Sequence, residues 1–175
     1  MIIHSIPIIS KEELKIERFI KLFGEYGIRI NPEIFSKDYL KNLAQTSFLL
    51  PDAEETLAEL FNRYRMVIIT NGFKEIQRPR FDRSSIKKYL EKIIVSDEIN
   101  AAKPNTEYFD AVFKEINYPD KNEVLVIGDG LTSDIQGGIN YELDTCWVNR
   151  GSLVNDTGLK IKYEIAGLAD LLTFL

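Results

Sequence analysis

The chain has 175 residues, of which 45% are hydrophobic and 28% are charged, as is typical of a globular protein with one core. This length indicates one domain, alone or with a small appendage. The net charge of −5 argues against nucleic acid as the main partner, because proteins bind a phosphate backbone through an excess of Lys and Arg. A small phosphorylated compound is not excluded, since a site can be locally positive in an acidic protein.

The start of the chain, residues 1–9, is apolar but too short to cross a bilayer core of about 30 Å as a helix. It also lacks the basic start and the small-residue cleavage site of a signal peptide. The single cysteine, Cys146, excludes an intrachain disulfide and fits a reducing compartment. Its apolar neighbours indicate a buried strand residue rather than a nucleophile. We therefore predict a cytoplasmic protein without a membrane partner.

The first fifty residues have the pattern of two helices. Ser10, followed three residues later by a glutamate, has the spacing of a capping box, and an apolar stripe then runs to Gly24 or Gly27. Asn31-Pro32 predicts the start of a second helix, with the cap followed by proline at the first helical position. We expect residues 1–50 to pack helix on helix, as a segment separate from residues 51–175.

After residue 50 the pattern alternates between helices and short apolar strands. Continuous apolar strands separated by helices are typical of a parallel sheet covered on both faces, so the predicted fold class is α/β, doubly wound and Rossmann-like. Pro79 should kink or end the helix in which it lies. The expected strands are 66–69, 93–95, 124–127 and 145–148, and the expected helices include 53–64, 106–116 and 135–141.

Polar residues follow three of these strands, at the sheet edge where parallel α/β folds bind ligands. Thr70-Asn71-Gly72 offers a hydroxyl and amides for an anion at a helix start, and Lys103 offers a cation. Asp129 and Asp134 offer the hard oxygen ligands that magnesium prefers. Each piece alone also fits a turn, a solvated loop or a helix cap. Together, in order and each at a strand end, they indicate a phosphate and magnesium site.

These segments resemble known motifs. Residues 68–73, 102–105 and 128–135 are similar to the second, third and fourth motifs of the haloacid dehalogenase superfamily. Residues 137–140 and 145–149 resemble the branch that includes the pyrimidine 5′-nucleotidases. The resemblance departs from the family at Gly130, where Ser or Thr is common, and at Pro79, in a helix that is usually continuous.

The resemblance implies a role for each site residue. The segment Thr70-Asn71-Gly72 would bind the substrate phosphoryl group together with Lys103, which would also act in catalysis by neutralising the nucleophile. Asp129 and Asp134 would place magnesium. The helices before residue 50 would be the remaining part of a helical cap. The implied activity is magnesium-dependent hydrolysis of a small phosphomonoester, with nucleoside 5′-monophosphates as candidate substrates.

One expected motif is absent from the sequence. The family's first motif, Asp-x-Asp, supplies the nucleophile that attacks phosphorus and the acid that protonates the leaving oxygen. The first 37 residues contain no aspartate, and Asp-x-Asp occurs nowhere in the chain. The single histidine, His4, lies in an apolar segment and is better explained as a packed or exposed residue. The chain would then be a truncated enzyme, inactive alone, that binds magnesium weakly. The alternatives are a non-catalytic remnant that binds phosphate or protein, and a mutase or dehalogenase.

The absent motif also removes a central strand. Burying its four or five apolar side chains is worth on the order of 10 kcal/mol, comparable with the whole stability of a domain. Two candidates can fill the position. One is residues 1–9, although Pro7 suits a strand end better than a central rung. The other is a strand of a second chain, which would give a swapped homodimer.

Overall fold

The computed structural model describes residues 10–175. The chain divides into two compact units, Met1–Thr46 and Ser47–Leu175. The expectation that residues 1–9 fill a strand position lies outside the described residues. Within residues 10–175, no helix is both long enough and apolar enough to cross a membrane.

The first unit begins with helix α1 (Lys11–Tyr26). The predicted capping box is confirmed: the N–H of Glu13 donates to Ser10 Oγ at 3.1 Å, and the N–H of Ser10 donates to Glu13 Oε2 at 2.8 Å. Of the two glycines considered for its end, Gly27 ends the helix, with a φ of 64° that glycine adopts without strain. Gly24 lies inside α1.

The second helix of this unit, α2 (Pro32–Ala44), starts where the sequence predicts. Asn31 Oδ1 accepts the N–H groups of Glu33 and Ile34. The two helices pack through edge-to-face aromatic contacts, which rings favour over face-to-face stacking. The contacting rings belong to Phe19, Phe23, Phe35 and Tyr39, with centroids 5.0–5.3 Å apart in the closest pairs.

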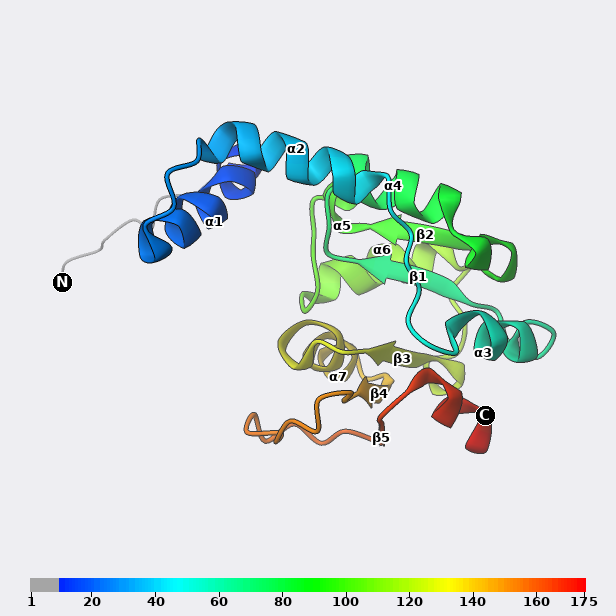
Figure 1. Cartoon of the computed structure of the whole chain (residues 1–175). Coiled ribbons are helices and arrows are strands. Elements are labelled where there is room, and N and C mark those ends of the chain that lie inside the picture. Colours follow the sequence, from blue (N-terminus) through cyan, green and yellow to red (C-terminus); the bar gives the residue numbers. More distant parts are fainter. Residues whose placement is uncertain (1–9) are drawn as a thin grey trace. The chain divides into compact units, whose positions relative to one another are not determined.

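The second unit has the predicted α/β architecture (Figure 1). All its paired strands are parallel, which confirms the fold class. A fifth strand, β5, was not predicted. The helices are α3 (Ala53–Leu60), α4 (Lys74–Arg83), α5 (Ser96–Ile99), α6 (Thr106–Glu115) and α7 (Gln136–Asn140). The strands are β1 (Val67–Thr70), β2 (Lys92–Val95), β3 (Leu125–Gly128), β4 (Asp144–Val148) and β5 (Tyr163–Ile165). Four shorter helical turns are η1 (Ser85–Tyr89), η2 (Lys121–Glu123), η3 (Leu131–Ile135) and η4 (Leu168–Thr173).

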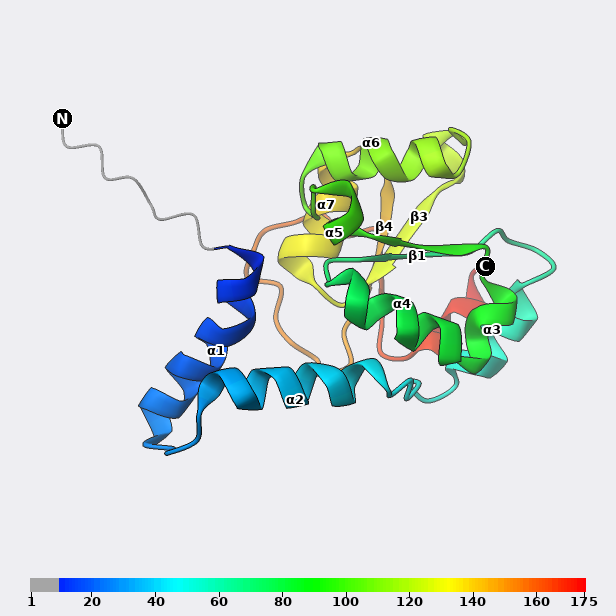
Figure 2. The ribbon, with the colours of Figure 1, turned by 90° about the horizontal axis from the view of Figure 1, so that it is seen from above.

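The strands form two separate sheets, β1-β2 and β3-β4-β5. Among the described residues, no strand pairs with β1 on the side opposite β2 or with β3 on the side opposite β4, and Figure 1 shows the two sheets apart. In Figure 2, α6 lies on one side of β1, while α3 and α4 lie on the other. Each face of the unit therefore has its own apolar cluster, one built on α6 and the other on α3 and η4.

The structure corrects two expectations about helices. Pro79 does not end its helix, because α4 continues to Arg83. Proline's fixed φ suits a helix, and the hydrogen bond that it removes falls on the carbonyl of Glu75, an exposed residue. The helix predicted over 53–64 ends at Leu60. Cys146 is fully buried on β4 as expected, and burial raises the pKa of its thiol to about 11.

Candidate active site

Lys103 lies at the carboxyl ends of β1 and β3. Its Nζ donates to the carbonyl of Ile69 at 2.8 Å and to Asp134 Oδ1 at 2.6 Å. The side chains of this ion pair are 7% and 13% exposed, so both charges are largely removed from water. Because one ammonium reaches the ends of both strands, β1 and β3 must end at the same edge of the unit.

The side chain of Asn71 fixes the loop that carries Lys103. Asn71 Nδ2 donates to the carbonyl of Lys103 at 2.7 Å, and Asn71 Oδ1 accepts the Lys103 N–H at 2.9 Å. One amide thus satisfies both backbone groups of a residue 32 positions later. The side chain of Asn71 is therefore engaged in holding Lys103.

Thr70 is held through its backbone by a buried tyrosine. The N–H of Thr70 donates to the hydroxyl of Tyr108 at 3.1 Å, and that hydroxyl donates to the carbonyl of Ile94 at 2.8 Å. Tyr108 is fully buried, and this burial raises the pKa of its phenol above the usual value, so the hydroxyl keeps its proton. Within the described chain, the hydroxyl of Thr70 and the N–H of Gly72 have no hydrogen-bond acceptor.

Asp134 is the second anchor of the site. Its Oδ1 accepts from Lys103, and its Oδ2 accepts the N–H of Gly130 at 3.1 Å. Gly128 allows this close approach, because a Cβ there would lie 2.5 Å from the Asp134 side chain. At Gly130, where the resemblance leads one to expect Ser or Thr, a Cβ would collide with Ser133 Oγ. The Ser133 hydroxyl therefore occupies the space that a side chain at position 130 would need.

Asp129 follows β3 directly and is exposed. Its backbone carbonyl accepts from Trp147 Nε1 at 3.1 Å, whereas its carboxylate has no partner among residues 10–175. No group of three or more His, Cys, Asp or Glu side chains in the described chain is placed to hold a metal ion. A free carboxylate beside an anion site does fit magnesium, which commonly takes one or two carboxylates, waters and substrate phosphate oxygens.

The structure therefore gathers the predicted residues at one sheet edge, with different engagements. Lys103, Asn71 and Asp134 bond to one another or to adjacent backbone, while Asp129 and the Thr70 hydroxyl remain available. Sequence reasoning missed Tyr108, which lies in the apolar stripe of α6. The signal for it was a tyrosine at a core position, because a buried phenol needs a hydrogen-bond partner.

Comparison with known proteins fits this arrangement. A family model for haloacid dehalogenase-like hydrolases matches residues 12–141. Pyrimidine 5′-nucleotidase PynA of Streptococcus pneumoniae is 34% identical over 168 residues, which cover 95% of this chain and 71% of PynA. The chain belongs to the haloacid dehalogenase-like hydrolases.

Two further proteins resemble this hydrolase. Pyrimidine 5′-nucleotidase YjjG of Escherichia coli is 32% identical over 151 residues, which cover 85% of the hydrolase and 67% of YjjG. The solved structure of YfnB from Bacillus subtilis, bound to magnesium, matches with a TM-score of 0.87 and 32% identity. That match covers 95% of the hydrolase and 73% of YfnB.

Proposed function

We propose that this hydrolase binds a small phosphomonoester at the carboxyl edge of β1 and β3, and that its reaction is phosphoester hydrolysis. The observation that supports the site most directly is the environment of Lys103. An ammonium has three N–H donors, and described residues accept two of them, the carbonyl of Ile69 and the carboxylate of Asp134. The remaining donor is available to an anionic oxygen.

The neighbouring groups complete an anion site. The free hydroxyl of Thr70 and the N–H of Gly72 donate to phosphate oxygens, and α4 begins two residues after Gly72. Asn71 contributes by holding the backbone of Lys103, so that the ammonium keeps its position. Lys103 acts in catalysis by neutralising negative charge that builds up around phosphorus.

Asp129 would hold magnesium, with Asp134 as a second ligand only where it gives up one of its two donors. Bound magnesium supplies charge neutralisation at phosphate oxygens. With one free carboxylate, we expect weak binding of magnesium to the chain alone. Calorimetry should show a weak affinity that improves when phosphate is present and is lost in Asp129→Ala. Tight binding without phosphate would contradict this assignment.

For the substrate, we propose nucleoside 5′-monophosphates. The support is the resemblance to PynA and YjjG, both named pyrimidine 5′-nucleotidases, at 34% and 32% identity. We assign the helices within residues 1–50 to a cap and residues 51–175 to the phosphate-binding core. A reducing, cytoplasmic location agrees with the single buried thiol of Cys146.

The printed sequence contains no Asp-x-Asp, and phosphoryl transfer to an aspartate needs that carboxylate. We therefore infer that the 175-residue chain by itself has no turnover. The same observation favours a second candidate, a non-catalytic protein that binds phosphate compounds or a protein partner. The two differ in one respect. Supplying the carboxylate-bearing strand switches on the hydrolase, whereas the non-catalytic protein stays silent.

Phosphate binding tests the proposed site without needing turnover. Inorganic phosphate titrated into the protein should shift the amide NMR signals of Thr70, Gly72 and Gly130. Lys103→Ala should abolish those shifts, while Lys114→Ala, at an exposed position of α6, should leave them intact. Equal shifts in both variants, or shifts confined to other residues, would contradict the site.

A further inference from the structure

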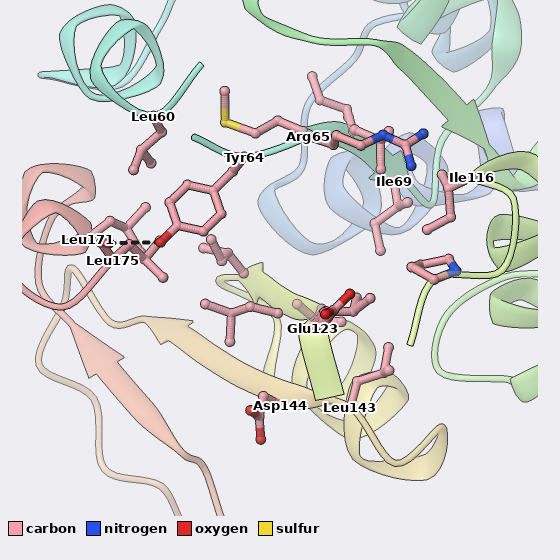
Figure 3. A pocket seen from close by; sticks show the side chains of 18 of the residues that line it. Leu60, Tyr64, Arg65, Ile69, Ile116, Glu123, Leu143, Asp144, Leu171 and Leu175 are labelled. Carbon is pink, nitrogen blue, oxygen red and sulfur yellow. Dashed lines mark hydrogen bonds between the residues drawn. The ribbon is translucent and has the colours of Figure 1, made fainter. Parts of the chain in front are cut away.

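A cavity of about 850 Å³ lies between β1 and β3. Consecutive residues of both strands line it, including Val67, Ile68 and Ile69 on one side and Leu125, Val126 and Ile127 on the other. Figure 3 shows Ile69, Ile116 and Leu143 lining one part of this cavity and Leu60 and Leu171 another.

The backbone edges that face the cavity lack strand partners in the described chain. β1 pairs with β2, and β3 pairs with β4, each on one side alone. The exception is the carbonyl of Ile69 at the end of β1, which accepts from Lys103. Unpaired strand edges are templates for another strand, and buried backbone groups without partners are costly. Each edge offers four residues, about 13 Å at ~3.3 Å per residue.

Exposure is confined to the strands that border this cavity. Ile127 in β3 is 38% exposed, although its flanking residues belong to a strand of a doubly covered sheet. In contrast, Ile93, Ile94 and Val95 of β2 are at most 5% exposed. A strand between β1 and β3 would cover Ile127 and give both strands the burial that β2 already has.

Both sides of the cavity plane are apolar. Val126 belongs to the cluster built on α6, while Leu125 packs against the cluster built on α3 and η4. Successive side chains of a strand point to opposite faces, so an inserted strand would place alternate residues in the two clusters. The occupant must therefore be a continuous apolar run rather than an alternating one.

The two ends of the cavity differ in charge. Ion pairs surround the amino ends of the strands, formed by Arg65 with Glu91 and by Lys162 with Asp144. At the carboxyl ends lies the buried ammonium of Lys103, with one donor unused in the described chain. A parallel strand that ends in a carboxylate would meet this cation, whereas an antiparallel strand would place that carboxylate beside Glu91 and Asp144.

We propose that this cavity binds an extended segment of a separate polypeptide, parallel to β1 and β3. The segment consists of four or five apolar residues followed by an acidic residue beside Lys103. The acidic end rests on the proposed function, because it places a carboxylate next to the phosphate site. The pairing itself rests on the strand edges and the apolar walls.

The chain's own sequence is a poorer occupant. Residues 1–9 contain Pro7, which lacks the N–H that a central strand needs, and they contain no Asp or Glu. A second copy of the chain would bring the same segment and no Asp-x-Asp. A separate segment of stated chemistry satisfies both the backbone edges and the charge of Lys103.

A synthetic peptide, KKIVVIFDAD, tests the proposal on the full 175-residue chain. It should bind, raise the melting temperature, and protect the amides of β1 and β3 from hydrogen exchange. A peptide with proline in the run, KKIVPIFDAD, and the reversed peptide DADFIVVIKK should not bind. The neutral peptide KKIVVIFNAN should bind at least about tenfold more weakly, because it lacks the charge-assisted bond to Lys103.

A matched pair of variants locates the binding surface. Ile127→Lys places a charge in the cavity at a position that is already partly exposed, so the fold should tolerate it, and peptide binding should be lost. Val154→Lys, 84% exposed and not among the residues that line the cavity, should bind the peptide normally. Equal binding by both variants would overturn the proposal.

Three other outcomes would also overturn it. Protection of β1 and β3 without peptide, lost when residues 1–9 are deleted, would assign the cavity to the chain's own start. Protection that depends on protein concentration would assign it to a second copy. No binding of KKIVVIFDAD would reject a separate segment altogether. Peptide binding without phosphate binding would contradict the proposed function and leave this inference intact, whereas phosphate binding without peptide binding would do the reverse.

Discussion

Lys103 Nζ donates to Asp134 Oδ1 at 2.6 Å, and this bond joins the loop after β2 to the turn after β3. Both side chains are largely buried, and Asn71 holds the backbone of Lys103 from a third loop. The phosphate-binding edge is therefore built by long-range polar contacts around one cation. Its stability and its chemistry depend on the same few bonds.

Asp134→Asn should destabilise the protein strongly. The change leaves the buried ammonium of Lys103 without its counter-ion, and breaking one side of a buried pair costs about 3–5 kcal/mol. Urea denaturation should show this loss in the free energy of unfolding. The control is Asp144→Asn, whose partner Lys162 is half exposed, and which should cost no more than about 1 kcal/mol. Similar losses in both variants would contradict the role of Asp134.

Tyr108→Phe should lower stability and disturb the site. The variant leaves the N–H of Thr70 and the carbonyl of Ile94 without their partner, at a cost of about 1–3 kcal/mol. Tyr118→Phe, at an exposed tyrosine, is the control and should change little. Amide NMR should show the Thr70 signal moving in Tyr108→Phe. An unchanged Thr70 signal would mean that the phenol does not hold this loop.

Gly130→Ala tests the turn that carries Asp134. A Cβ at this position collides with Ser133 Oγ and lies 2.9 Å from Asp134 Oδ2, so the turn must shift. Such overpacking costs about 1–3 kcal/mol. Gly151→Ala, where a Cβ meets nothing closer than 3.6 Å, should cost less. Thermal unfolding of the two variants provides the comparison, and an equal melting temperature for both would be the contrary result.

The buried thiol of Cys146 predicts a specific pH dependence of stability. Burial raises its pKa from an ordinary value of 9.0 to about 11 in the folded protein. Between pH 9 and 11 the unfolded thiol loses its proton while the folded thiol keeps it. Stability from this group is thus present below pH 9 and declines as pH rises through that window, by about 2 kcal/mol in all. Cys146→Ala should flatten this part of the profile, and a decline of the same size in the variant would exclude Cys146 as its source.

Local features of the fold were readable from the sequence. Ser10 and Asn31 cap their helices through neighbours two or three residues away, so the sequence pattern contains the whole interaction. The apolar runs that became β1 and β3 were similarly evident. Strand β5 was not, because Tyr163–Ile165 is short and is defined by its pairing with β4 rather than by its own pattern.

The candidate site was predictable in membership and not in wiring. The sequence placed Thr70, Lys103 and Asp134 at strand ends, and parallel topology brings such ends together. It could not show that Asn71 would hold the backbone of a residue 32 positions away, or that Tyr108 would support Thr70. Those bonds depend on the packed geometry of separate elements.

The most direct test of the account is turnover with the carboxylate-bearing strand restored. Residues 1–175 should hydrolyse a nucleoside 5′-monophosphate no faster than background with magnesium present, because losing a nucleophile costs about 10⁶-fold in turnover. Adding an apolar strand that ends in Asp-x-Asp should switch activity on. Replacing its first Asp by Asn, or Lys103 by Ala, should switch it off again. Robust turnover by the 175-residue chain alone, or silence after the strand has been shown to bind, would contradict the account.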